Sequence, residues 1–305
     1  MRNCQRRMVC LTALLALGVL NSTGVANAAR SRQLPERKMN AAMQIQGSWS
    51  NGVLSYSFDR SDITNVTLNG VSIKPSFEVN GGMDFQPLGG ARAFLNGDLP
   101  VTSDRMDATI RAIIRNGLTF QAEHQHFYDF TPMVWFIHIR GRGGALSLAR
   151  RVHRVLVAAR TPLPQSSPSN PKTPFNVKRL KRILHAYDAQ VGQDGVVTFL
   201  VSRRNPIFID GIRVNPTTNI ATNVAFEPLN GSGSRAAAVP DFGLTATEVN
   251  RVIGTMQRQG WDIGCLYNQE TGESPQLYFS HDFRTGDPYT LAREIRNGLN
   301  RMNSH

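Results

Sequence analysis

The spacing of apolar residues changes from strand-like to helix-like in the same order in both halves of the chain. They first alternate with polar residues, as in Val53 to Phe58, which is typical of half-buried strands. They then recur at helical spacing, and after that come two further alternating stretches and a closing helical one. The sequence therefore predicts strands, a helix, two strands and a helix in each half. The central helical positions are Met106, Ile110, Ile113 and Ile114 in the first half and Val249, Val252, Ile253 and Met256 in the second.

The two halves also match residue by residue, with an offset of 141 to 143 positions. Phe85-Gln86-Pro87-Leu88 recurs as Phe226-Glu227-Pro228-Leu229, and the order of matched residues is kept throughout. Further matched pairs are Asp98 with Asp241, Ile110 with Ile253, Gly117 with Gly260, and His138 with His281. This series indicates an internal duplication.

Turn and cap residues lie at the ends of the predicted elements. Asn69-Gly70 and Asp210-Gly211 are dipeptides that type I′ hairpins favour. Thr245 and Glu248 have the spacing of a helix capping box, while Gly117 and Gly260 can end the central helices. The predicted fold is α+β, with two tandem homologous domains that each form a mainly antiparallel sheet covered by helices.

We expect the domain boundaries to follow this duplication. The first repeat domain is placed at residues 36–160 and the second at 177–302, each with a short helix at its start. Between them, residues 161–176 are rich in proline and serine, a composition typical of an extended linker.

Residues 1–28 have the pattern of a cleaved signal peptide. Arg2, Arg6 and Arg7 precede an apolar run from Met8 to Leu20, and Val25-Ala26-Asn27-Ala28 fits a cleavage site. The apolar run is short for a membrane span, so we expect a periplasmic or secreted product without a transmembrane segment. Cleavage would leave Cys265 as the only cysteine and rule out an internal disulfide.

The net charge of +12 remains basic without the three signal arginines. Outside the cytoplasm, such a charge favours contact with anionic envelope polymers, although a solubilising surface is the more ordinary explanation. The basic run from Lys178 to Arg182 fits one face of an amphipathic helix, so a nucleic-acid partner is disfavoured.

Three histidines fall in the predicted hairpin after the central helix of the first domain. Residues two apart share a face of a strand, so Phe120, Ala122, His124 and His126 are expected on one side. A hairpin centred near Thr131 would set His138 opposite His124. The equivalent side of the second copy begins apolar, which indicates a sheltered face, and it carries Cys265, Tyr267 and Gln269 there.

The histidine cluster leads to a metal-site hypothesis. His124, His126 and His138 would supply imidazole ligands to zinc or copper, with Tyr128 and Asp129 approaching from the hairpin loop. Hydrogen-bonded interior histidines without a metal are the alternative. The second copy keeps only His281, so the site is assigned to the first domain, while Tyr267 and His281 could line a pocket for a neutral ligand.

Two other residues have both a chemical and an ordinary interpretation. Asp98 could act as a general base, but Asn96-Gly97-Asp98 before a helix more often shapes a turn. Cys265 matches Ala122 on the inward face, so burial is favoured over nucleophilic reactivity.

Residues 52–156 resemble the LppY/LpqO family of exported bacterial proteins, a tandem domain family of unknown function. Residues 194–299 resemble it more faintly. The resemblance implies export and duplication but no activity. It is carried by Asn69-Gly70-Val71, Lys74-Pro75, Phe85-Gln86-Pro87, Gly97-Asp98-Leu99, Thr102, His124-Gln125-His126 and Phe136-Ile137-His138.

Three functions remain open from the sequence. The first is an exported binding protein that holds a transition metal or a small anionic ligand at the three histidines. The second is a metal-dependent hydrolase or oxidase with Asp98 or Asp129 as proton acceptor. The third is an envelope interaction module that binds through its basic surface.

Overall fold

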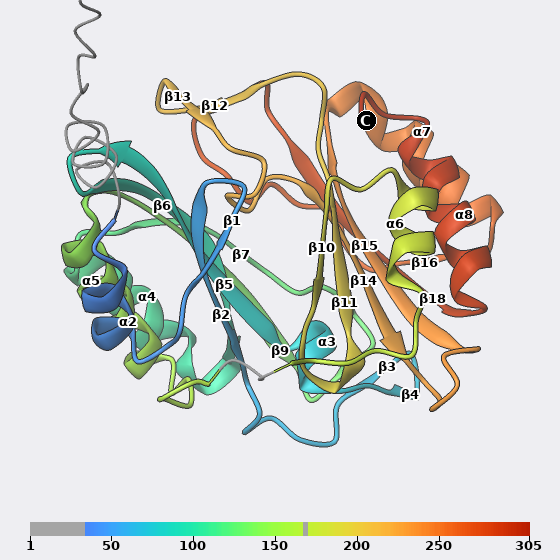
Figure 1. Ribbon diagram of the computed structural model, residues 1–305, viewed down its shortest axis with the longest axis horizontal. Helices are drawn as coiled ribbons and strands as arrows, with labels where there is room; N and C mark the ends of the chain where they lie inside the picture. Colours follow the sequence, from blue (N-terminus) through green and yellow to red (C-terminus); the bar gives the residue numbers. More distant parts are fainter. Residues whose placement is uncertain (1–33, 167–169) are drawn as a thin grey trace, which may run out of the picture.

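The computed structural model describes residues 34–166 and 170–305. The segment with the signal-peptide pattern therefore lies outside the described residues. The chain forms two α+β domains, and each contains one six-stranded antiparallel sheet with helices on its outer side (Figure 1). No helix within the described ranges is long and apolar enough to cross a bilayer.

The first domain's large sheet has the strand order β1-β2-β5-β6-β9-β7. Every neighbouring pair in it is antiparallel. Its strands span Ser48–Ser50 (β1), Val53–Asp59 (β2), Asn80–Gly89 (β5), Arg92–Thr102 (β6), Thr119–His124 (β7) and Val134–Gly144 (β9).

The second domain repeats this order with β10-β11-β14-β15-β18-β16. Its large sheet is also antiparallel throughout. The strands span Asp188–Val191 (β10), Val197–Val201 (β11), Thr222–Pro228 (β14), Ala236–Leu244 (β15), Asp262–Ile263 (β16) and Tyr278–Gly286 (β18).

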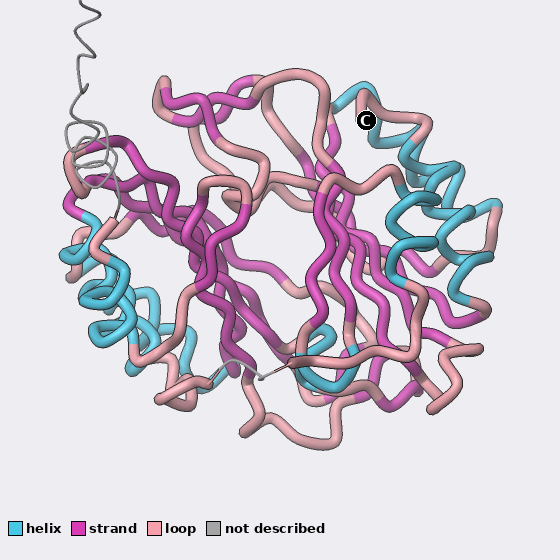
Figure 2. Tube along the Cα trace, in the orientation of Figure 1, coloured by secondary structure: helices cyan, strands magenta, loops and turns pink. Residues whose placement is uncertain are grey.

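Each domain carries three helices on the outer side of its sheet (Figures 1 and 2). In the first they are Glu36–Met43 (α2), Met106–Arg115 (α4) and Ala145–Ala158 (α5). In the second they are Val177–Leu184 (α6), Ala246–Arg258 (α7) and Pro288–Leu299 (α8). The predicted capping box is confirmed, because the Thr245 backbone N–H donates to Glu248 Oε2 at 2.7 Å.

A small three-stranded sheet accompanies each large one. Thr67–Leu68 (β3), Val71–Ser72 (β4) and Phe130–Thr131 (β8) form the first, and Ile207–Ile209 (β12), Ile212–Val214 (β13) and Glu273–Ser274 (β17) the second. Both predicted two-residue hairpins are confirmed, because Asn69, Gly70, Asp210 and Gly211 all have positive φ. The short helix Pro75–Glu78 (α3) follows β4 and contacts β14 of the other domain.

A buried arginine occupies the same place in both domains. Arg60 Nη1 donates to Pro100 O at 2.9 Å, and Arg203 Nη1 donates to Gly243 O at 2.8 Å. Each arginine also makes two hydrogen bonds to a carboxylate, but the partners differ: Arg60 pairs with Asp62, two residues away, and Arg203 with the distant Glu248.

Apolar packing occurs on both faces of the large sheets. One cluster fills the space between sheet and helices in each domain. Two more clusters join the domains: Phe127, Val134 and Phe136 pack with Val239 and Phe283, and Phe94 packs into a group from the second domain. The inner faces of the two sheets therefore cover each other.

Candidate functional site

A cavity of about 450 Å³ lies between the inner faces of the two sheets, and we call it the central cavity. Its walls come from both domains: β2, β5, β6 and β9 on one side and β11, β14, β15 and β18 on the other. His126, His138, Tyr267 and His281 are among its lining residues. The face that the sequence predicted to be sheltered is thus covered by the second domain, opposite the helical layer.

His124 and His138 meet as a pair at this interface. Their Nε2 atoms are 2.9 Å apart, so one nitrogen donates a hydrogen to the other. His124 Nδ1 lies 3.3 Å from Gln125 O, while His138 Nδ1 has no hydrogen-bond partner although it is buried. Burial lowers the pKa of His124 to about 3 and that of His138 well below its ordinary value, so both imidazoles are neutral near pH 7.

The predicted register of these two histidines is wrong. His138 pairs across the strands with Ala122, and His124 pairs with Phe136. A register irregularity between Phe120 and Ala122 also turns Phe120 toward the helices, where it packs against the core beneath them. The imidazoles still touch because they are diagonal neighbours on the same face.

His126 belongs to a different group, with Glu78 and His281. One ligating atom from each of these three buried residues lies within 4.8 Å of the others. His126 Nδ1 is 3.0 Å from Glu78 Oε2, and the His126 ring is stacked between Phe136 and His281 at centroid distances of 3.4 and 3.7 Å. The assignment of the site to the first domain alone is therefore corrected, because His281 comes from the second.

Asp98 and Asp241 place an equivalent carboxylate beside an equivalent histidine in each sheet. Asp98 pairs directly with His138, and Asp241 pairs directly with His281. The turn predicted at Asn96-Gly97-Asp98 is wrong, because these residues lie within β6. Gly97 is needed there since a Cβ atom on it would lie 2.1 Å from Gly82 O.

Carboxylates crowd the walls of the central cavity. Burial and Asp98 hold the pKa of Asp84 at about 7, and burial holds that of Asp98 at about 7. Burial, with Asp241 and Asp98 nearby, raises the pKa of Glu78 well above its ordinary value. Within the described part of the chain, the lining residues include five carboxylates (Asp59, Glu78, Asp84, Asp98 and Asp241) and no lysine or arginine.

The remaining predicted site residues divide into two groups. Tyr267 lines the cavity and stacks on His124 at a centroid distance of 3.5 Å. Cys265 is largely buried, with its Sγ 3.3 Å from His281 Nδ1, and burial raises its pKa. By contrast, Tyr128 is 71% exposed and Asp129 is exposed as well, so neither approaches the cavity as expected.

Glu78 and Asp84 line the cavity but were not predicted from the sequence. The sequence could have placed Asp84 within a strand, because its neighbours Met83 and Phe85 are apolar. No sequence pattern could have identified Glu78, because its position at the cavity depends on the packing of α3 against the second domain.

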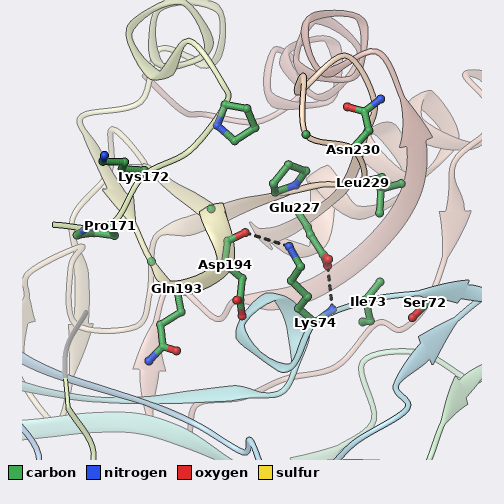
Figure 3. A pocket seen from close by; sticks show the side chains of 15 residues that line it. Ser72, Ile73, Lys74, Pro171, Lys172, Gln193, Asp194, Glu227, Leu229 and Asn230 are labelled. Atoms are coloured by element: carbon green, nitrogen blue, oxygen red, sulfur yellow. Dashed lines mark hydrogen bonds between the residues drawn. The ribbon is translucent and has the colours of Figure 1, made fainter. Parts of the chain in front are cut away.

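A more open pocket of about 720 Å³ adjoins the central cavity and shares Pro171, Gly192 and Gln193 with it. Figure 3 shows Lys74 crossing this outer pocket from the first domain to the second. Its Nζ donates to Asp194 O at 3.1 Å, and its backbone N–H donates to Glu227 Oε2 at the same distance.

Comparisons with solved structures give only remote likenesses. A trimeric bacterial microcompartment shell protein, PduB, is 11% identical and has a TM-score of 0.23, covering 85% of this chain and 91% of its own. EtuB from Clostridium kluyveri is 9% identical with a TM-score of 0.18, covering 83% and 90%. No curated protein sequence matches the chain.

A family profile, in contrast, matches the chain twice. The two matches cover residues 37–158 and 178–301, one for each domain of the structure. The chain belongs to the family described as Domain of Unknown Function (DUF1259), and it carries that domain as a tandem pair.

Proposed function

We propose that this protein is an exported binding protein that holds a transition metal ion between its two domains. The observation that supports the proposal is the group of Glu78, His126 and His281, whose ligating atoms lie within 4.8 Å of one another. Two imidazoles and one carboxylate form a donor set that suits zinc and also iron(II), and such a set leaves positions open for other ligands.

The charge around this group favours a cation. Burial raises the pKa of Glu78 and of Asp241 well above their ordinary values, and repulsion from Asp241 raises that of Glu78 further. A bound cation would relieve this repulsion and favour the ionised carboxylates. A small anion would meet the five carboxylates without a lysine or arginine among the described lining residues.

The neighbouring imidazoles would complete the environment of the ion. His124 lies 6.0 Å from His281 between ring centroids, and His138 is bonded to His124. We propose this pair as additional donors, so the originally expected histidines take part together with Glu78 and His281. Because the His126 and His281 rings stack at an interplanar angle of 19°, an ion bound by both nitrogens would tilt the rings apart.

Export and family assignment within this proposal rest on the sequence alone. The signal pattern supports a periplasmic or secreted location, and the motifs around His124 and His138 support the LppY/LpqO resemblance. Among the described residues, α6 buries Leu180 and Leu184 and exposes basic side chains, so contact with anionic envelope polymer stays compatible with the proposal.

Metal content of the purified protein tests the proposal. We expect about one equivalent of zinc or another transition metal by elemental analysis, and loss of at least about 100-fold in affinity in Glu78→Gln. Glu123→Gln is the matched control, because Glu123 is exposed on the opposite face of β7. A wild-type protein that takes up no transition metal at micromolar concentration would refute the proposal.

A metal-dependent hydrolase is the second candidate. Its support is Asp98, a carboxyl group with a pKa of about 7 directly across the strands from His138. A group with such a pKa can accept a proton from metal-bound water near neutral pH. Turnover of ester or phosphoester substrates by the zinc-loaded protein, lost in Asp98→Asn with the zinc still bound, would favour this candidate over simple binding.

A further inference from the structure

The central cavity is larger than one ion needs. A water molecule takes about 30 Å³ in the liquid, and pockets for small organic ligands start at about 300 Å³. The central cavity of about 450 Å³ falls in that range. Its walls also extend well beyond Glu78, His126 and His281, onto β2, β5 and β6.

On that side the wall is built of small polar residues around two acids. Ser55 pairs with Asp84, Ser57 pairs with Gly82, and Gly82 pairs with Asp98, so all five lie on one face of the sheet. A Cβ atom on Gly82 would meet no atom within 4 Å. The glycine therefore leaves open space between Ser57 and Asp98.

Several polar atoms that line the cavity have no partner. His138 is 2% exposed and its Nδ1 makes no hydrogen bond. Asp241 Oδ1 and Asn219 Nδ2 are also buried and unpaired. Buried polar atoms are normally satisfied, so these three indicate a ligand that offers both hydrogen-bond donors and acceptors.

We propose that the central cavity binds a small hydroxylated amine, with its ammonium group between Asp84 and Asp98 and its hydroxyl groups against the Ser55, Ser57 and Asn219 side chains. Asp84 and Asp98 are not among the proposed metal ligands, so the inference does not depend on the metal proposal. An ammonium fits better than a second metal ion, since the group of Glu78, His126 and His281 is the metal-type cluster found within the described ranges and contains neither Asp84 nor Asp98.

The charge of the ligand follows from the lining. Asp84 and Asp98 are diagonal neighbours on one face of the sheet, and no lysine or arginine from the described chain lines the cavity to offset their charge. A primary ammonium supplies one positive charge and three donors, which matches two neighbouring carboxylates. Hydroxyl groups on the same molecule match the serines and the asparagine amide.

Calorimetry with two related probes tests this inference. D-glucamine is a linear polyol with one primary amine, and sorbitol carries a hydroxyl group in place of that amine. We expect D-glucamine to bind the purified protein at least about tenfold more tightly than sorbitol, which corresponds to about 1.4 kcal/mol. Equal binding of the two, or no binding of D-glucamine at millimolar concentration, would overturn the inference.

Variants separate this site from the metal site. Asp84→Asn and Asp98→Asn should each weaken D-glucamine binding at least about tenfold. Asp107→Asn, whose side chain is 89% exposed, should leave it unchanged. Glu78→Gln should weaken metal binding at least about 100-fold but keep D-glucamine binding, so each proposal can fail without the other. Retained D-glucamine binding in the folded double variant Asp84→Asn/Asp98→Asn would place the amine elsewhere and contradict the inference.

Discussion

The two domains share one fold but contribute unequally to their common interface. Each sets an aspartate beside a histidine on its inner face, Asp98 with His138 and Asp241 with His281. Only the first adds the His124 and His126 pair, for which the second has Tyr267 and Gln269. Both copies therefore keep the Asp–His pair, while the other side chains on the two inner faces have diverged.

The largest expected difference between the domains concerns the two buried arginines. Replacement of Arg203 by Met should lower the free energy of unfolding by about 3–5 kcal/mol, because Glu248 is nearly buried and would lose a two-pronged partner. Arg60→Met should cost less, about 1–3 kcal/mol, because Asp62 is 41% exposed and water can solvate it. Urea unfolding followed by circular dichroism measures both; equal losses would show that the acidic partner is irrelevant.

The equivalent histidines offer a second contrast. His281→Gln should weaken metal binding about 100-fold, or about 2.7 kcal/mol, because His281 belongs to the ligand group with Glu78. His138→Gln should have a smaller effect, about tenfold, because His138 reaches that group through His124. Competition with a chromogenic chelator gives both affinities, and His185→Asn is an exposed control. A larger loss of affinity in His138→Gln than in His281→Gln would indicate that the metal ligands come from the first domain.

The smallest expected effect concerns the pH dependence of stability. Burial raises the pKa of Asp84, Asp98 and Glu270 to about 7. Their unfolded-state pKa is near 4, so the folded protein binds more protons, and stability is lost as the pH rises through 7. Each group contributes a slope of at most about 1.4 kcal/mol per pH unit. The buried histidines, whose pKa burial lowers, contribute a slope of opposite sign up to about pH 7, because they gain protons on unfolding.

Asp98→Asn should flatten that slope, whereas the exposed Asp107→Asn should not. Chemical unfolding of the metal-free protein between pH 6.5 and 8.5 measures the difference. Parallel pH dependence of the wild type and Asp98→Asn would contradict the raised pKa of Asp98.

Local features of the fold were predictable from sequence because local forces decide them. The hairpins at Asn69-Gly70 and Asp210-Gly211, the capping box at Thr245 and the central helices all follow from conformational preference and apolar period. The hairpin register was not predictable, because the irregularity between Phe120 and Ala122 leaves no clear mark in the pattern. The sequence Asn96-Gly97-Asp98 suggested a turn, because such residues are common in turns. In the structure, Gly97 is required by its close approach to Gly82 within the sheet.

The site itself could be predicted only in part. The two-residue alternation of the strands correctly places the histidines on a sheltered face of the sheet. It does not indicate that the second domain covers this face. Glu78 and His281 are about 200 positions apart in the chain and meet only because two sheets pack face to face. No local pattern encodes such a meeting.

The face-to-face packing of the sheets also bears on how such a protein could be shortened. A chain with one copy of the domain would present Val134, Phe136 and a row of acids and imidazoles to water, since its helices cover only the other side. Two such chains could bury these faces against each other, with an Asp–His pair from each lying at the shared surface. In this molecule the tandem arrangement joins the two domains in one chain, so each inner face is covered by the other.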